Sequence, residues 1–192
     1  MEFAFTIVQL IYWLALATWF GGVLFIAIAA PIIFRTVRET DPTLPMVLSV
    51  NMEGQHSTLL AGSIVANLLA AFQRIQLACA GALLVAIIGQ WVMFYPAQLF
   101  SLALRSALFL ATTALVIYDW RVVSPSIYRS RQQYIDHADE PEIANPAKEQ
   151  FDRFHAESVM LLTIELALLL GLVLFSAGIT APLHAMPTVP HP

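Results

Sequence analysis

Four long apolar runs divide the chain, and more polar segments separate them. The runs cover residues 3–34, 75–95, 99–120 and 158–180. Each meets or exceeds the roughly 20 residues that an α-helix needs to cross the hydrocarbon core of a bilayer. The pattern therefore predicts an all-α fold, a four-helix transmembrane bundle, in which residues 1–181 form a single membrane domain.

The segment before the second run leaves two interpretations open. Residues 58–72 are apolar, but about 15 residues are short for a span, and they continue through a few polar positions into the second run. One long helix that projects beyond the membrane is the simpler prediction, and a separate surface helix within residues 46–72 is the alternative. Upstream, Pro42 and Pro45 break any helix and predict a loop or a short surface helix.

Prolines mark three other places. Pro96 lies in the short link between the second and third runs, and a link this short predicts that these two helices are antiparallel neighbours. Pro31 predicts a bend near the end of the first helix without a break in the span. Residues 182–192 are rich in proline and lack periodicity, so they predict a tail outside the bundle.

Composition excludes an ordinary soluble fold. Hydrophobic residues make up 59% of the chain and charged residues only 11%, against roughly 25% charged in a typical soluble domain. A cleaved signal peptide is the rival interpretation of the first run, because residues 27–29 read Ala-Ile-Ala. The run has no preceding Lys or Arg and is about twice as long as a signal peptide's apolar core, so a transmembrane helix is favoured.

The basic residues gather in two connections that the four-span topology puts on one side of the membrane. The positive-inside rule makes this side cytoplasmic, with both termini and the Pro96 link outside. A bacterial inner membrane is the expected location, and the net charge of −4 gives no indication of nucleic-acid binding. Of the nine Lys and Arg residues, these two connections hold Arg35, Arg38, Arg121, Arg129, Arg131, Lys148 and Arg153.

Small side chains recur along the first helix. Ala15, Gly22 and Ala29 follow one another at seven-residue intervals, and Thr18 lies on the same face. Membrane helices associate through such faces because lipid supplies no hydrophobic drive between them. The face predicts a close contact with a neighbouring helix, although chance in an alanine-rich helix would give the same pattern.

Two ionisable residues lie inside the predicted spans. Arg105 should be about 9 Å deep from the outside, and Gln9 and Gln90 should share its depth. Glu165 should be about 9 Å deep from the cytoplasmic side. Intramembrane ionisable groups are candidate functional residues by default. The alternatives are that Arg105 extends to the headgroups and that Glu165 is protonated and bonded to another helix.

Histidines and carboxylates flank the cytoplasmic ends of the second and fourth helices. Glu53 and His56 precede the second helix, and His155 and Glu157 enter the fourth. These side chains could bind a divalent metal or relay protons, although the spacing matches no defined metal motif. His137 is expected in an acidic loop. No catalytic signature for phosphate transfer, acyl transfer or thiol chemistry appears, so an enzyme is not favoured.

Four short motifs carry a family resemblance. They are WFGG at residues 19–22, APIIFR at 30–35, VSP at 123–125 and FDRFHAES at 151–158. The chain resembles, over nearly its whole length, the transmembrane protein 205-like family of four-helix membrane proteins, whose function is unassigned. The first motif is also similar to copper-resistance membrane proteins and haem-linked protoporphyrinogen oxidases. Those families carry a histidine in the first helix, where residues 8–13 here read VQLIYW.

Three classes of function therefore stay open. The first is a non-enzymatic accessory subunit that packs against other membrane subunits within the bilayer. The second is a haem- or metal-associated redox protein that uses His56 and His155. The third is a small transporter or lipid-handling protein. No cofactor follows from the residues alone.

Overall fold

The computed structural model describes residues 2–40, 42, 56–93 and 99–177. All regular elements in these ranges are helices: α1 (Glu2–Thr40), α2 (His56–Met93), α3 (Leu99–Tyr118), the π-helix η3 (Asp119–Val123), α4 (Ser124–Asp136) and α5 (Pro141–Ser176). Four helical stretches are long and apolar enough to cross a membrane. The chain is a multi-pass integral membrane protein, and the prediction of an all-α four-helix bundle is confirmed.

Helix boundaries settle one of the open interpretations. Residues 58–72 belong to α2, which begins at His56 and runs unbroken to Met93. The prediction of one long helix is therefore confirmed for these residues, while residues 46–55 lie outside the described part of the chain. α1 runs without interruption through Pro31. Pro96 and the tail 182–192 also lie outside the described residues.

The connection between the third and fourth spans is more ordered than the sequence indicated. α3, η3 and α4 follow one another without a break, and α5 begins at Pro141, well before its apolar run. His137, which was expected in an acidic loop, lies in the tight turn between α4 and α5, where its backbone N–H bonds the Gln133 carbonyl. The expectation of a flexible loop was wrong, because a helical hairpin satisfies the backbone of this polar segment.

Buried positions alternate at intervals of three and four residues on the helices that cross the membrane. This spacing is the seam of a left-handed coiled-coil packing, in which long helices stay in contact over many turns. On α1 the buried positions are Tyr12, Leu16, Trp19, Val23 and Ile26; on α2 Phe72, Gln76, Cys79, Leu83, Ala86 and Gln90; on α3 Leu102, Arg105, Phe109, Thr112 and Val116.

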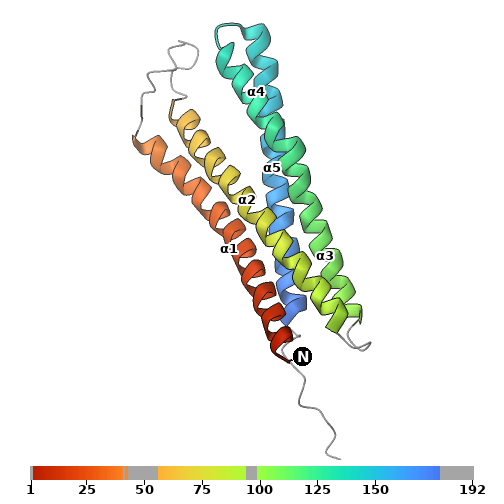
Figure 1. Cartoon of the computed structure of the whole chain (residues 1–192). Coiled ribbons are helices and arrows are strands. Elements are labelled where there is room, and N and C mark those ends of the chain that lie inside the picture. Colours follow the sequence, from red (N-terminus) through yellow and green to blue (C-terminus); the bar gives the residue numbers. More distant parts are fainter. Residues whose placement is uncertain (1, 41, 43–55, 94–98, 178–192) are drawn as a thin grey trace, which may run out of the picture.

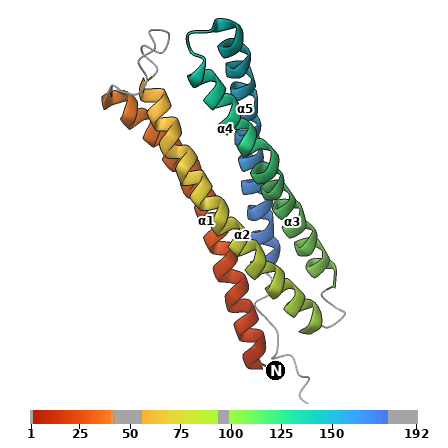
Figure 2. The same ribbon diagram turned by 45° about the horizontal axis from the view of Figure 1, so that its top comes forward.

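The helices form two groups, which we call the α1–α2 pair and the α3–α4–α5 unit. In the pair, α1 and α2 lie side by side (Figure 1). In the unit, α5 runs antiparallel to the continuous rod of α3, η3 and α4. Figure 2 shows that the two groups approach each other along the lower half and diverge toward the end that carries α4.

Close approach within the α1–α2 pair depends on Gly22. A Cβ atom at this position would collide with the Phe72 ring of α2. The small-residue face predicted on α1 is thus partly present, because Gly22 meets Phe72 and Ala15 is buried, whereas Thr18 is exposed. The interface within this pair is therefore tight and largely apolar.

Candidate functional site

Buried polar side chains lie where the α1–α2 pair meets the α3–α4–α5 unit. Hydrogen bonds from α1 and α2 cross to α3, η3, α4 and α5 at several heights. We call this interface the polar seam. It consists of Tyr12, Trp19, Gln73, Gln76, Gln90, Arg105, Asp119, Ser124, Ser158, Glu165 and Ser176.

Glu165 occupies the middle of the polar seam. Its side chain is only 5% exposed. One carboxyl oxygen, Oε1, accepts hydrogen bonds from Trp19 Nε1 on α1 at 2.6 Å and from Gln76 Nε2 on α2 at 2.6 Å. A single carboxyl group therefore joins three helices.

Neither donor to Glu165 carries a charge. Among the described residues, no Lys or Arg side chain forms an ion pair with this carboxyl. An isolated buried carboxylate is costly in a low-dielectric interior, and proteins neutralise such groups by proton uptake or by an opposite charge. Glu165 is thus a buried group for which a proton is the simplest neutralising partner.

The π-helix η3 builds a second polar group around Asp119. In η3 the backbone N–H of Ser124 donates to the carbonyl of Asp119, five residues earlier. This wider turn lets the Ser124 hydroxyl donate to Asp119 Oδ2 at 3.0 Å. From α2, Gln73 Nε2 donates to Asp119 Oδ2 at 2.7 Å and to Ser124 Oγ at 2.9 Å.

A fourth residue closes this group from α5. The Ser158 hydroxyl donates to Asp119 Oδ1 at 3.2 Å. We call Gln73, Asp119, Ser124 and Ser158 the Asp119 node. Single-turn π segments occur frequently at functional sites, and here the segment brings together side chains that an α-helical register would separate.

Arg105 lies at the opposite end of the polar seam and is 1% exposed. Its Nη1 donates to Gln90 Oε1 at 3.1 Å, and its Nε donates to the Ser101 carbonyl at 3.2 Å. The Tyr12 hydroxyl is close enough to interact with the guanidinium and also bonds Ser176 Oγ at 2.6 Å. Arg105 is therefore held inside the bundle and does not extend into lipid.

The two predicted partners of Arg105 behave differently. Gln90 bonds Arg105 as predicted. Both polar atoms of the Gln9 side chain are buried without a hydrogen-bond partner in the described part of the protein. The prediction that Gln9 also holds Arg105 was wrong, because a shared depth along the membrane normal does not ensure that two side chains face each other.

The polar seam spans much of the membrane. Arg105, Thr112 and Asp119 follow one another on α3 and η3 at seven-residue intervals, so they share one face at steps of about 10 Å. Thr112 is buried and bonds the Leu108 carbonyl. The three positions cover about 20 Å of the roughly 30 Å hydrocarbon thickness. Arg105 and Glu165 have separate partners, and no direct ion pair joins them.

The two histidines proposed as ligands lie at different heights. Gln73 of α2 is level with Asp119, so His56 lies about 25 Å from that level at the start of the same helix. His155 is only three residues before Ser158, which bonds Asp119, and its ring stacks on Phe151. The structure therefore does not bring His56 and His155 together.

Metal binding at these positions stays a prediction. No group of three or more His, Cys, Asp or Glu side chains in the described ranges is arranged to hold a metal ion. Glu53 lies outside the described residues, and Glu157 accepts a hydrogen bond from the Tyr118 hydroxyl at 2.8 Å.

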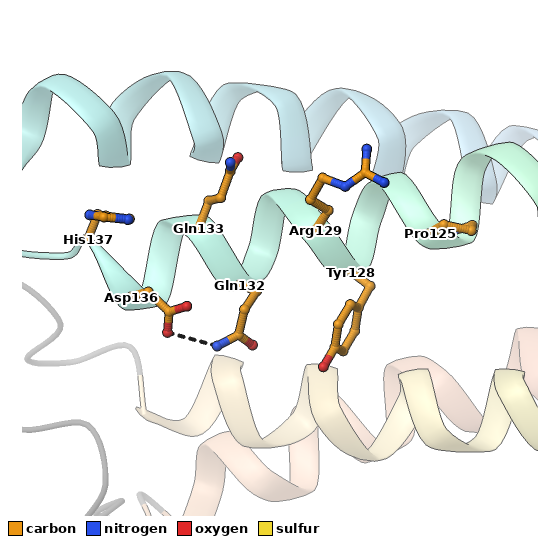
Figure 3. A pocket seen from close by; sticks show the side chains of 7 residues that line it. All are labelled: Pro125, Tyr128, Arg129, Gln132, Gln133, Asp136 and His137. Atoms are coloured by element: carbon orange, nitrogen blue, oxygen red, sulfur yellow. Dashed lines mark hydrogen bonds between the residues drawn. The ribbon is translucent and has the colours of Figure 1, made fainter.

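A hollow lies away from the polar seam, on α4. It has a cavity volume of about 470 Å³ and is lined by Pro125, Tyr128, Arg129, Gln132, Gln133, Asp136 and His137. Figure 3 shows Tyr128, Gln132 and Asp136 on the side of α4 that faces α2. Gln132 Nε2 donates to Asp136 Oδ1 at 2.8 Å, and the Tyr128 side chain is 70% exposed.

Sequence reasoning missed most of the partners in the polar seam. Trp19 contributed only to a motif, and Gln73 and Gln76 were treated as a polar interruption of an apolar run. Amides inside a span are a usable signal, because they are costly in lipid and therefore tend to face other helices. No sequence signal indicated the π-helix that joins Asp119 to Ser124.

These contacts define a class, a four-helix integral membrane protein whose two helix groups meet at a polar seam. Comparison of the chain with known protein families, with curated proteins and with solved structures finds no match. The function is therefore argued from the polar seam itself.

Proposed function

We propose that the protein is a small ion-handling membrane protein of the transporter class, in which Glu165 takes up and releases a proton. The observation that carries the proposal is the buried Glu165 carboxyl, which bonds two neutral donors from the opposite helix pair. Ionisable residues inside a bundle commonly mark proton relays and ion pathways. Asp119 is the charged group that acts electrostatically on Glu165 from the neighbouring turn region.

Protonation of Glu165 would change how the two helix groups are held together. Hydrogen bonds to a carboxylate are roughly twice as strong as those between neutral groups. Proton uptake weakens the Trp19 and Gln76 contacts at Oε1, and proton release strengthens them. Because these contacts join the α1–α2 pair to α5, the protonation state of one side chain biases the relative position of the two groups.

The test uses the full chain reconstituted into liposomes that enclose a pH-sensitive dye. After an inward proton gradient is imposed, the wild-type protein should acidify the lumen faster than protein-free liposomes, and Glu165→Gln should abolish the difference. Glu149→Gln, an exposed position on the same helix, is the matched control and should behave as wild type. Equal flux through wild type and Glu165→Gln would disprove the proposal.

An accessory subunit is the second candidate, favoured by the α4–α5 hairpin. This hairpin extends past the apolar runs and presents the exposed Tyr128 beside the hollow on α4. An exposed aromatic side chain on a polar hairpin is suited to contact another protein chain. Tyr128→Ala should release a co-purifying subunit under gentle extraction while leaving the monomer's stability unchanged. If the chain purifies alone from native membranes, this candidate fails.

Orientation and location complete the proposal. The basic residues that gather in the connections after α1 and around α4 support a cytoplasmic position for the hairpin, with both termini outside, in a bacterial inner membrane. The resemblance to the transmembrane protein 205-like family supports the same four-helix arrangement. A membrane-impermeant thiol reagent should label a cysteine at Glu149 only after the membrane is opened.

A further inference from the structure

The Asp119 node gathers oxygen atoms from three separate helical segments. Asp119 and Ser124 come from the rod that contains η3, Ser158 comes from α5, and Gln73 comes from α2. The node offers two carboxylate oxygens, two hydroxyl oxygens and one amide. Oxygen ligands of this kind are the choice of hard cations, in contrast to the sulfur and imidazole ligands of softer metals.

The charge of the node is uncompensated. Asp119 accepts hydrogen bonds only from neutral groups, namely an amide and two hydroxyls, within the described part of the chain. The nearest arginine along the chain, Arg121, stacks its guanidinium on the Trp120 ring at 4.5 Å. One carboxylate surrounded by neutral oxygens matches a cation of a single positive charge, since a second positive charge would stay unbalanced in a half-buried site.

We propose that the Asp119 node binds a monovalent alkali cation, with Na⁺ as the preferred ion. The ligands are the Asp119 carboxylate, the Ser124 and Ser158 hydroxyl oxygens, and the amide oxygen of Gln73. Gln73 presents Oε1 when its terminal amide turns over, which exchanges the positions of its oxygen and nitrogen. Polar atoms of the node are only 2.7 to 3.2 Å apart, so the smaller Na⁺ fits with less expansion than K⁺.

This site goes beyond the proposed proton binding, because it uses different residues. Gln73 and Gln76 are one turn apart on α2, and they bond Asp119 and Glu165 respectively. Two carboxylates this close repel each other, so a cation at Asp119 would favour the charged form of Glu165. By linkage, proton uptake at Glu165 would then weaken cation binding, which is the relation that exchange of the two ions requires.

The test measures thermal unfolding of the purified full chain in nanodiscs while Na⁺ replaces choline at constant ionic strength. The wild-type melting temperature should rise with Na⁺ and saturate, with a smaller rise for K⁺ at equal concentration. Asp119→Asn should abolish the rise. Asp152→Asn, an exposed aspartate on α5, should retain it.

A second variant keeps the proposal falsifiable if Asp119→Asn does not fold. Ser158→Ala removes one ligand and should shift the Na⁺ titration midpoint about tenfold higher without preventing saturation, since a lost hydrogen-bond-sized interaction of about 1.4 kcal/mol corresponds to a tenfold change in affinity. An unchanged midpoint in Ser158→Ala would overturn the site.

Other outcomes separate this proposal from its neighbours. Equal stabilisation by Na⁺ and choline would show an ionic-strength effect and overturn the cation site. Tighter binding of Ca²⁺ than of Na⁺ would overturn the monovalent assignment and point to participation of Glu157. Glu165→Gln should keep the Na⁺ response, so failure of proton transport and failure of cation binding are distinguishable.

Discussion

The two interfaces of α2 differ in chemistry. On one side α2 meets α1 through a tight, largely apolar contact in which the Phe72 ring lies against the bare backbone of Gly22. On the other side it meets the α3–α4–α5 unit through three amides, Gln73, Gln76 and Gln90. Apolar packing responds to shape alone, whereas hydrogen bonds to ionisable groups respond to protonation and ions. The pair is therefore suited to stay together, and the polar seam is suited to change.

The largest effect should come from filling the contact within the α1–α2 pair. Gly22→Leu puts a side chain where the Phe72 ring lies, and overpacking of this kind costs about 3 kcal/mol of unfolding free energy. The measurement is thermal or denaturant unfolding in detergent. Gly21→Leu is the control, because a Cβ there meets nothing within 4 Å. Similar losses in both variants would contradict the tight α1–α2 contact.

An intermediate effect should distinguish the two glutamines near Arg105. Gln90→Leu removes the side-chain acceptor of a buried guanidinium, which should cost about 2 kcal/mol of unfolding free energy. Gln9→Leu removes an amide whose polar atoms have no partner in the described part of the chain, so stability should stay equal or rise. The same unfolding measurement compares the two variants. A larger loss for Gln9→Leu would invalidate the arrangement described for the polar seam.

The smallest effect should show that the polar seam responds to pH. Trp19→Phe keeps the ring packing but removes the N–H that donates to Glu165. The cost should be about 1 kcal/mol or less, since hydrogen bonds between membrane helices average about 0.6 kcal/mol. This cost should be largest where Glu165 is charged and should shrink as pH falls, because the lost bond is stronger to a carboxylate. A pH-independent cost would argue against titration of Glu165.

Much of the fold was predictable from the length of the apolar runs. The bilayer has a fixed thickness, so a run of about 20 apolar residues leaves few alternatives to a spanning helix. The continuity of residues 58–72 with α2 also followed from the sequence. The helical hairpin of α4 and α5 did not, because its polar residues carry a weaker periodic signal than an apolar span.

The polar residues divide in the same way. By itself the sequence determined that Arg105 and Glu165 lie within spans and need polar partners, because lipid offers them none. Only the tertiary structure decided which partners they have. It gave Gln90 to Arg105 and left Gln9 aside, gave Trp19 and Gln76 to Glu165, and used η3 to join Asp119 to Ser124. The physical reason is that depth along the membrane follows from counting residues, whereas the facing of side chains depends on how the helices are rotated and packed against one another.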